Sequence, residues 1–232
     1  MNWRLSSLDR YTLVSNSDSH SPWPWRIGRE ANAFDLTELT YRSILNALMK
    51  KDSNRLEFTI ETDPSYGKYH WTGHRQCKVS MSPTEAIKVG NICPVCGRKL
   101  TKGVSQRVEE LADRPQGFTP KGAAGYMHLL PLSEIIQTVK GCSSPNVRSV
   151  WDIYGRLIDR FGDEYKVLIE ASLEDIKDVA GEEIANSVVS VREGKVKVTP
   201  GYDGVYGKIE LLPSMKNMKQ KTRRRPTLDD FL

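Results

Sequence analysis

Two short pairs of residues in the middle of the chain carry side chains that bind metal ions. His74 and Cys77 form the first pair, Cys93 and Cys96 form the second, and two residues separate the members of each pair. This spacing lets two side chains on one tight turn reach the same ion, and Zn²⁺ prefers four nitrogen or sulfur ligands in a tetrahedron. The sequence therefore predicts a structural zinc site, with His70 as the alternative to His74. The competing interpretation is that the cysteines are ordinary buried residues.

A closed set of four protein ligands leaves no position for a substrate, so the predicted role of this metal is structural rather than catalytic. The second pair reads Cys93-Pro-Val-Cys-Gly97, in which the proline stiffens the turn and the glycine relieves crowding around the thiolates. The surrounding segment, residues 67–103, is rich in Gly, Pro and Lys and poor in large aliphatic residues. We expect the ion to hold this polar segment in shape. The remaining cysteine, Cys142, stands alone and is interpreted as a packing residue or a solvated thiol.

Positive charge concentrates in two parts of a chain whose formal net charge is +5. Residues 67–104 hold seven Lys or Arg against one Glu, a balance of +6, and residues 214–232 hold six against two Asp, a balance of +4. Basic charge around a metal loop and in a tail is typical of proteins that contact nucleic-acid phosphates. A solvated basic face is the alternative. The candidate phosphate contacts near the zinc ligands are Arg75, Lys78, Arg98, Lys99 and Lys102.

A second candidate metal motif, Asp18-Ser-His20, lies where an expected buried strand within residues 8–17 gives way to a loop. A carboxylate and an imidazole two residues apart at a strand end can both face one catalytic metal ion, whereas a surface turn is the alternative. Trp23 and Trp25 follow this motif. They either stack on a base extruded from DNA or pack the protein interior.

Three further residues are candidate DNA contacts. Arg29 either contacts a phosphate or forms a surface ion pair with Glu30. Tyr202 and Tyr206 alternate with glycines in the sequence Pro200-Gly-Tyr-Asp-Gly-Val-Tyr-Gly207. They either stack on DNA or belong to an ordinary β-hairpin turn.

The elements that must position these residues are mixed helices and strands, so the chain is assigned to the α+β class. Apolar residues at helical spacing predict helices at 36–50 and 103–114, and alternation predicts a strand at 56–62. Beyond Pro131 the pattern is helical: Pro131 and Gly141 bound one helix, and a second runs from Ser144 toward Gly162. The remaining expected elements are shorter helices at 165–171, 173–180 and 182–193 and a terminal β-hairpin around residues 200–204.

Several blocks of sequence, in order along nearly the whole chain, resemble endonuclease Q, a family of DNA repair endonucleases. Residues 13–22 also resemble the last metal-binding motif of the polymerase-and-histidinol-phosphatase (PHP) superfamily of metal-dependent phosphoesterases. The chain looks like the C-terminal portion of an endonuclease Q. The blocks are Asn2-Trp-Arg-Leu-Ser-Ser-Leu-Asp-Arg-Tyr11, Gly28-Arg-Glu-Ala-Asn32, Gly73-His-Arg-Gln-Cys77, Cys93-Pro-Val-Cys-Gly97, Arg107-Val-Glu-Glu-Leu-Ala-Asp-Arg114 and Pro200-Gly-Tyr-Asp-Gly-Val-Tyr-Gly207.

This resemblance implies an enzyme that nicks DNA on the 5′ side of deaminated bases (uracil, hypoxanthine, xanthine) and abasic sites by metal-dependent phosphodiester hydrolysis. It implies a catalytic centre with Mg²⁺, Mn²⁺ or Zn²⁺, of whose ligands this chain matches only Asp18 and His20. It also implies four parts: a C-terminal remnant of a PHP β/α barrel at 1–52, a zinc-binding element at 53–105, a helical C-terminal domain with a terminal hairpin at 106–213, and a disordered basic tail at 214–232.

With two catalytic ligands, the chain by itself is expected to have little or no nuclease activity, because two ligands cannot hold a metal cluster that activates water and stabilises the developing charge. A truncated gene product, or a separate chain that supplies the N-terminal part of the barrel, would explain the missing ligands. The alternative function is a non-catalytic, zinc-containing module that binds DNA or a sliding clamp. The sequence has no GxxxxGK[ST] pattern, so helicase activity is not expected.

The C-terminal tip resembles the peptide by which archaeal repair enzymes bind the sliding clamp (PCNA). Leu228, Phe231 and Leu232 occupy its apolar positions, whereas Arg225 stands where that peptide usually has Gln. The sequence contains no apolar run of about 18 residues and no long apolar stretch at its N-terminus. We therefore expect no membrane association and no secretory signal, with a cytoplasmic location as the default.

Overall fold

The computed structural model describes residues 1–50 and 55–211 of the 232-residue chain. The apolar residues of the clamp-binding-like tip, Leu228, Phe231 and Leu232, lie outside the described residues.

The chain divides into two compact units. Unit 1 combines residues 1–134 with 196–210, and unit 2 contains residues 135–195 together with Leu211. The segment boundaries predicted after residues 52 and 105 both fall inside unit 1.

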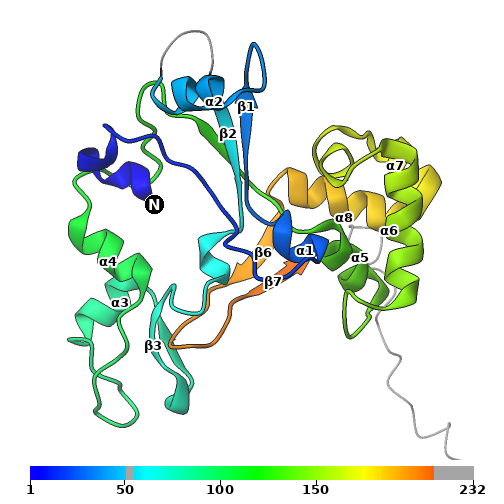
Figure 1. The fold of residues 1–232 in the computed structure, drawn as a ribbon. Helices are drawn as coiled ribbons and strands as arrows, with labels where there is room; N and C mark the ends of the chain where they lie inside the picture. The colour runs from blue at the N-terminus through cyan, green and yellow to red at the C-terminus, as the bar shows by residue number, and fades with distance from the viewer. Residues whose placement is uncertain (51–54, 212–232) are drawn as a thin grey trace, which may run out of the picture. The chain divides into compact units, whose positions relative to one another are not determined.

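A three-stranded sheet organises part of unit 1 (Figure 1). β1 runs antiparallel to β2 with a bulge between Ala33 and Phe34, whereas β5 runs parallel to β2. The order across the sheet is β1-β2-β5, so the two outer strands come from opposite sides of the metal-binding segment in the sequence. The strand predicted at 56–62 is confirmed as β2. The three strands are β1 (Ala31–Asp35), β2 (Arg55–Glu61) and β5 (Gly125–His128).

Helix α2 (Tyr41–Leu48) follows β1 in the chain and packs against β2. It is shorter than the helix predicted at 36–50 because Thr40 forms its N-cap. The Thr40 hydroxyl accepts a hydrogen bond from the Ser43 N–H at 3.1 Å, which satisfies one of the free donors at the start of the helix.

The prediction of a strand within residues 8–17 is wrong. The chain begins with two 3₁₀ turns, η1 (Asn2–Arg4) and η2 (Ser6–Leu8), and then runs without helix or strand to α1 (Pro24–Ile27). The Ser15 backbone pairs with the side chain of Asn32 rather than with another strand: its N–H donates at 2.9 Å and its carbonyl accepts at 2.7 Å. This amide occupies the backbone groups that a strand ladder would need.

A small hairpin-and-helix element forms another part of unit 1 (Figure 1). β3 and β4 pair antiparallel, and the helix predicted at 103–114 appears as the shorter α4. The hydrophobic core of this element consists of the buried Ala86, Cys93 and Leu100, with the partly buried Cys77, Val79 and Met81 packed against them. Its segments are β3 (Thr72–His74), the 3₁₀ turn η4 (Arg75–Cys77), β4 (Val79–Met81), α3 (Pro83–Lys88) and α4 (Val104–Leu111).

The terminal hairpin is confirmed, because β6 (Val196–Thr199) pairs with β7 (Lys208–Leu211). Its connecting loop, residues 200–207, is more than a turn. The Gly201 N–H donates to the Ser65 carbonyl at 2.9 Å, next to the 3₁₀ turn η3 (Pro64–Tyr66), and the Trp71 N–H donates to the Gly201 carbonyl at 2.8 Å. The loop therefore joins the terminal hairpin to the segment that leads into the metal element.

Unit 2 is helical, as predicted (Figure 1). Helix α5 (Leu132–Lys140) leads into it, and α6 (Arg148–Phe161) ends at Gly162, whose φ of 95° suits glycine. The helices α7 (Leu173–Ala180) and α8 (Glu182–Arg192) complete the unit. The segment predicted as a helix at 165–171 forms instead a π-helical turn, η5 (Lys166–Glu170). The buried core is aliphatic and includes Ile135, Ile136, Val150, Leu157, Val167, Ile176, Ile184 and Val188.

Arg192 at the end of α8 stabilises the π-helical turn. Its guanidinium donates to the carbonyl oxygens of Val167, Leu168 and Ala171, at 3.0, 2.8 and 2.8 Å. These carbonyls lie where the helical hydrogen-bond pattern breaks, so they need donors from elsewhere. Burial lowers the pKa of Arg192, which nevertheless stays charged at neutral pH.

We predict that Arg192→Met lowers the free energy of unfolding by about 2–4 kcal/mol, because three carbonyls lose charge-assisted donors. Urea denaturation followed by circular dichroism measures this quantity. The matched control is Arg156→Met on the exposed face of α6, which should change the free energy by less than about 0.5 kcal/mol. Equal effects of the two substitutions would contradict the role given to Arg192.

Candidate metal site and basic surface

Four of the predicted metal ligands converge in unit 1. The ligand atoms of His74, Cys77, Cys93 and Cys96 all lie within 4.8 Å of one another, and His74 Nδ1 is 3.4 Å from Cys96 Sγ. Within residues 1–50 and 55–211, this is the one group of three or more His, Cys, Asp or Glu side chains so arranged. One imidazole and three thiols at these distances fit a single tetrahedral zinc ion.

Two similar turns bring the ligand pairs together. The residue after each pair has a left-handed backbone: Lys78 has φ 54° and Gly97 has φ 71°. This conformation turns the chain back directly after the cysteine. In the second turn the Gly97 N–H donates to the Cys93 carbonyl at 2.9 Å, and the Cys93 N–H donates to the Arg98 carbonyl at 2.7 Å. Cys93 is the one buried side chain of the four, at 1% exposure. Its thiol therefore lies on the inner side of the cluster.

The thiols differ in how readily they lose a proton. Burial and hydrogen bonds to the thiols of Cys96 and Cys93 raise the pKa of Cys77 to about 11. At Cys93 burial also acts to raise the pKa, but the backbone N–H groups of Cys96 and Val95 outweigh it and lower the pKa to about 6. One thiolate is therefore favoured at neutral pH, and a divalent cation would displace the remaining thiol protons on binding.

His70, the alternative fourth ligand, lies outside this group. Burial lowers the pKa of its imidazole. Its backbone has a structural role, because the His70 N–H donates to the Gly67 carbonyl at 3.1 Å and its carbonyl accepts from the Ser105 N–H at 2.9 Å near the start of α4. The geometry therefore favours His74 as the nitrogen ligand.

The predicted phosphate contacts around the metal cluster are all exposed. Lys102 forms an ion pair with Glu110 at 2.7 Å, so part of its charge is already neutralised. The other four, Arg75, Lys78, Arg98 and Lys99, form no ion pair within 4 Å with any carboxylate in the described part of the chain. We call these four residues the basic loop. The charge of Lys78, Arg98 and Lys99 is available for an anionic partner, whereas the charge of Arg75 also interacts with the Asp203 carboxylate.

Asp203 links the terminal hairpin to the metal cluster, and the sequence analysis missed it. Its carboxylate accepts a hydrogen bond from the Arg75 N–H at 2.6 Å, directly after the ligand His74. Burial acts to raise the pKa of Asp203, but this bond and one from Thr101 outweigh burial and lower it. Asp203 and Arg75 are 128 positions apart, so only the folded chain shows the contact.

The residues of the second predicted motif, Asp18 and His20, are both exposed on the irregular segment before α1. Asp18 has a left-handed backbone, with φ 46°. The structure brings no third His, Cys, Asp or Glu side chain to them among the residues it describes. Close by in the sequence, Trp23 stacks on the buried Trp25 with ring centroids 5.0 Å apart and nearly parallel planes. Packing is thus the role of Trp25.

The other candidate DNA contacts differ in availability. Arg29 is engaged in an ion pair with Glu134 and lies over the ring of Tyr66 at 5.9 Å. Tyr202 packs against Gly73, where an added Cβ would lie 2.5 Å from its ring. Tyr206, in contrast, is 59% exposed.

Comparisons with known proteins find one family model and two curated relatives. A family model described as the MJ0043 C-terminal domain matches residues 131–195. The chain is 34% identical over 98% of its length to the uncharacterized protein MJ0043 of Methanocaldococcus jannaschii, and 32% identical over 89% of its length to the uncharacterized protein YqxK of Bacillus subtilis. It covers 28% of the first and 48% of the second, so it spans less than half the length of these relatives.

Two solved structures share the fold at 32% sequence identity. The TM-score is 0.82 to the lesion-specific endonuclease PfuEndoQ from Pyrococcus furiosus, and 0.78 to endonuclease Q in complex with a 27-mer duplex substrate that has an abasic lesion at the active site. Each match covers 91% of this chain and 52% of the solved chain. The chain is thus similar to a class of DNA repair endonucleases. Within that class it is similar to endonuclease Q, and the resemblance and α+β fold predicted from the sequence are confirmed.

None of the helices in the described residues has the length and apolar character needed to cross a membrane.

We predict that the purified chain contains about one zinc ion, measured by inductively coupled plasma mass spectrometry. Cys93→Ser and His74→Ala should each reduce the zinc content to less than about half, because three ligands hold the ion weakly. Chelation should also increase proteolysis between residues 67 and 103.

Two substitutions serve as matched controls for this prediction. Cys142→Ser removes a thiol outside the cluster, and His70→Ala removes the rejected ligand. Both variants should keep their zinc. Loss of zinc in His70→Ala with retention in His74→Ala would overturn the assignment of the fourth ligand.

Proposed function

We propose that the chain is the C-terminal part of an endonuclease-Q-like DNA repair protein. The observation that carries this proposal is the TM-score of 0.82, over 91% of the chain and at 32% identity, to a lesion-specific endonuclease. The reaction is nicking of DNA on the 5′ side of deaminated bases (uracil, hypoxanthine, xanthine) and abasic sites. The abasic duplex in the second solved complex supports damaged DNA as the substrate class.

Four parts divide the work in this proposal. Residues 1–52 are a remnant of a PHP barrel, residues 53–105 are the zinc-binding element, residues 106–213 are the helical C-terminal domain, and residues 214–232 are a basic tail that docks on a sliding clamp through Leu228, Phe231 and Leu232.

The metal element contributes DNA binding rather than chemistry. His74, Cys77, Cys93 and Cys96 would hold one Zn²⁺, which cross-links a segment that buries few apolar residues. The cross-link fixes the positions of the basic loop, whose side chains contact DNA phosphates. Lys102 and Arg29 add weaker contacts because both form ion pairs. Tyr202 packs against Gly73 and so stabilises the backbone next to His74.

Asp18 and His20 supply two ligands of the catalytic metal centre, which takes Mg²⁺, Mn²⁺ or Zn²⁺. Such a metal, when bound, polarises the phosphodiester and lowers the pKa of an attacking water. The exposure of both side chains supports this role, because neither is committed to the core. A separate chain that carries the N-terminal part of the barrel would supply the remaining ligands.

A cavity of about 830 Å³ in unit 1 supports a binding site for such a partner chain. It lies beside β2 and β5, and its wall includes Trp3, Tyr126 and His128, whose rings form a row with centroids 5.2 and 5.1 Å apart. Among the described strands, β5 pairs with β2 alone, so its outer edge can accept a further strand.

The second candidate function is a non-catalytic module that binds DNA or the clamp. The observation in its favour is that Asp18 and His20 have no third metal ligand near them in residues 1–50 and 55–211. The two functions differ in one respect: only the first requires these two side chains for activity.

We predict that the chain binds duplex DNA through the basic loop. Arg98→Gln with Lys99→Gln should weaken binding about 5- to 20-fold in fluorescence anisotropy and reduce the steepness of its salt dependence, because two phosphate contacts are lost. The matched control is Lys140→Gln with Arg156→Gln, which removes the same charge from unit 2. Equal weakening by both double variants would show a general charge effect instead of a specific surface.

The catalytic proposal is tested by complementation. The part of the Pyrococcus furiosus endonuclease that this chain does not match is mixed with the chain, and nicking of an abasic duplex is followed with Mg²⁺ or Mn²⁺. We predict nicking by the mixture, little by the chain alone, and a loss of at least about 100-fold with Asp18→Asn and His20→Ala.

Asp35→Asn is the matched control for the complementation, because Asp35 is an exposed acid on β1. Efficient nicking by the chain alone would overturn the need for a second chain. Unchanged nicking by the Asp18 and His20 variants would overturn their catalytic role.

A further inference from the structure

Two tyrosines lie around one lysine on unit 1, and a third tyrosine lies beside one of the two. Lys68 Nζ lies 5.7 Å from the centroid of the Tyr69 ring and 5.8 Å from that of Tyr206. The rings of Tyr66 and Tyr206 are 5.8 Å apart and inclined by 35°. We call Tyr66, Lys68, Tyr69 and Tyr206 the tyrosine platform. It joins the turn after η3 to the loop of the terminal hairpin.

The platform is not part of the core. Tyr69 is 46% exposed and Tyr206 is 59% exposed, and Lys68 is also exposed. Tyr66 is partly buried beside them. Single exposed aromatic residues are common, but two exposed rings grouped with a third are typical of a binding surface. The ammonium of Lys68 is within cation–π range of two rings, which keeps the group together while one side stays open.

The backbone beneath the platform is closely held. The Gly204 N–H donates to the Lys68 carbonyl at 2.8 Å, and the Gly207 N–H donates to the Tyr66 carbonyl at 2.9 Å. An added Cβ at Gly207 would lie 2.6 Å from the Ser65 carbonyl oxygen, so a larger residue would separate the two segments. The tyrosines are thus presented on a fixed base, which reduces the entropy lost on binding.

The charge around the platform defines the kind of partner. Arg75 of the basic loop flanks it: a Cβ built on Gly204 would be 3.5 Å from Arg75 Nη1 and 3.7 Å from Tyr69 Oη. Asp203, the nearest acid in this loop, is engaged with the Arg75 N–H. Open aromatic faces beside cations match a chain that alternates flat rings with phosphates.

We propose that the tyrosine platform stacks on an unpaired base of a DNA strand while Lys68 and Arg75 contact the adjoining phosphates. This inference rests on the proposed DNA repair function and adds to it a site for the strand displaced around a lesion. Tyr206 and Tyr69 provide the stacking faces, and Tyr66 supports Tyr206 from the side.

The test uses the full chain and a single-stranded oligonucleotide with one 2-aminopurine, a base whose fluorescence falls on stacking. Binding of the unaltered chain should quench this fluorescence at least about twofold. Tyr69→Ala and Tyr206→Ala should each remove most of the quenching and weaken binding about 5- to 50-fold. Tyr206→Phe keeps the ring, so it should bind within about twofold of the unaltered chain.

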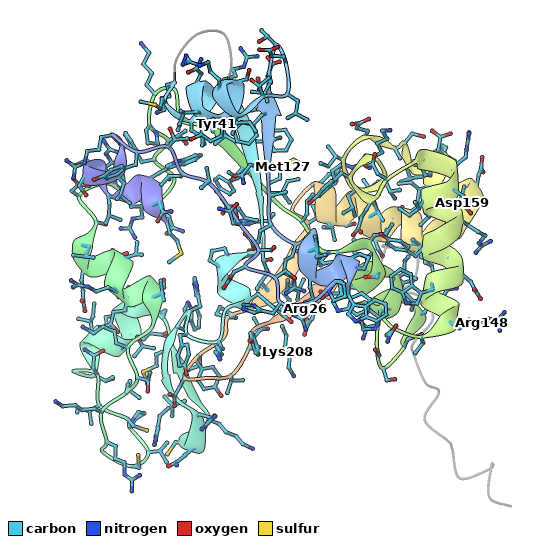
Figure 2. The ribbon with its side chains drawn as sticks, in the orientation of Figure 1. Arg26, Tyr41, Met127, Arg148, Asp159 and Lys208 are labelled. Carbon is cyan, nitrogen blue, oxygen red and sulfur yellow. The ribbon has the colours of Figure 1, made fainter. Side chains whose placement is uncertain are left out.

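The matched control is Tyr41→Ala, which removes a tyrosine that is 82% exposed on α2 (Figure 2) and should change nothing. Lys68→Ala supplies a second variant, with weaker binding and a smaller salt dependence expected. Zinc content and circular dichroism check that every variant is folded.

The outcomes separate this inference from the proposed function. One outcome is that duplex binding depends on Arg98 and Lys99 while single-strand binding is unchanged by substitution of Tyr69 and Tyr206. This outcome would overturn the role of the tyrosine platform but not the proposed DNA function. An absence of binding to any DNA would overturn both. Equal losses for Tyr206→Phe and Tyr206→Ala would assign the effect to the hydroxyl and overturn stacking.

Discussion

In the proposed function, the shape of the segment between residues 67 and 103 depends on a cross-link through one metal ion. Its fully buried apolar residues are Ala86, Cys93 and Leu100, with Cys77, Val79 and Met81 partly buried against them, and two of these six belong to the candidate metal cluster. Burial of so little apolar surface cannot offset the conformational entropy lost by ordering about forty residues. An ion held by the one imidazole and three thiols that converge here would supply the constraint that hydrophobic burial does not.

A second constraint comes from the loop of the terminal hairpin. The terminal hairpin returns to the metal element, where Asp203 holds the backbone just after His74 and Gly201 pairs with Trp71. The metal turns, the basic loop and the tyrosine platform therefore share one framework. Charge and aromatic surface lie side by side because the same backbone contacts position both.

The sequence predicted the parts of the structure that depend on local spacing. The two pairs of metal ligands, the helices of unit 2 and the strand β2 all follow from patterns within a few residues. The prediction of a strand at 8–17 is wrong because the side chain of Asn32, which is distant in the sequence, forms hydrogen bonds with the Ser15 N–H and carbonyl. The sequence named Tyr206 as a DNA contact but not its neighbours in the tyrosine platform, for the same reason. Tyr66 and Tyr206 meet only after folding, and no local pattern encodes such a contact.

Unit 1 is assembled from both sides of unit 2 in the sequence, because residues 196–210 belong with residues 1–134. During synthesis the whole helical unit leaves the ribosome before the hairpin loop that completes unit 1. Domains generally fold as units from the N-terminal side as they emerge. The surface beside the metal turns can therefore be completed only after residues 200–207 have been synthesised.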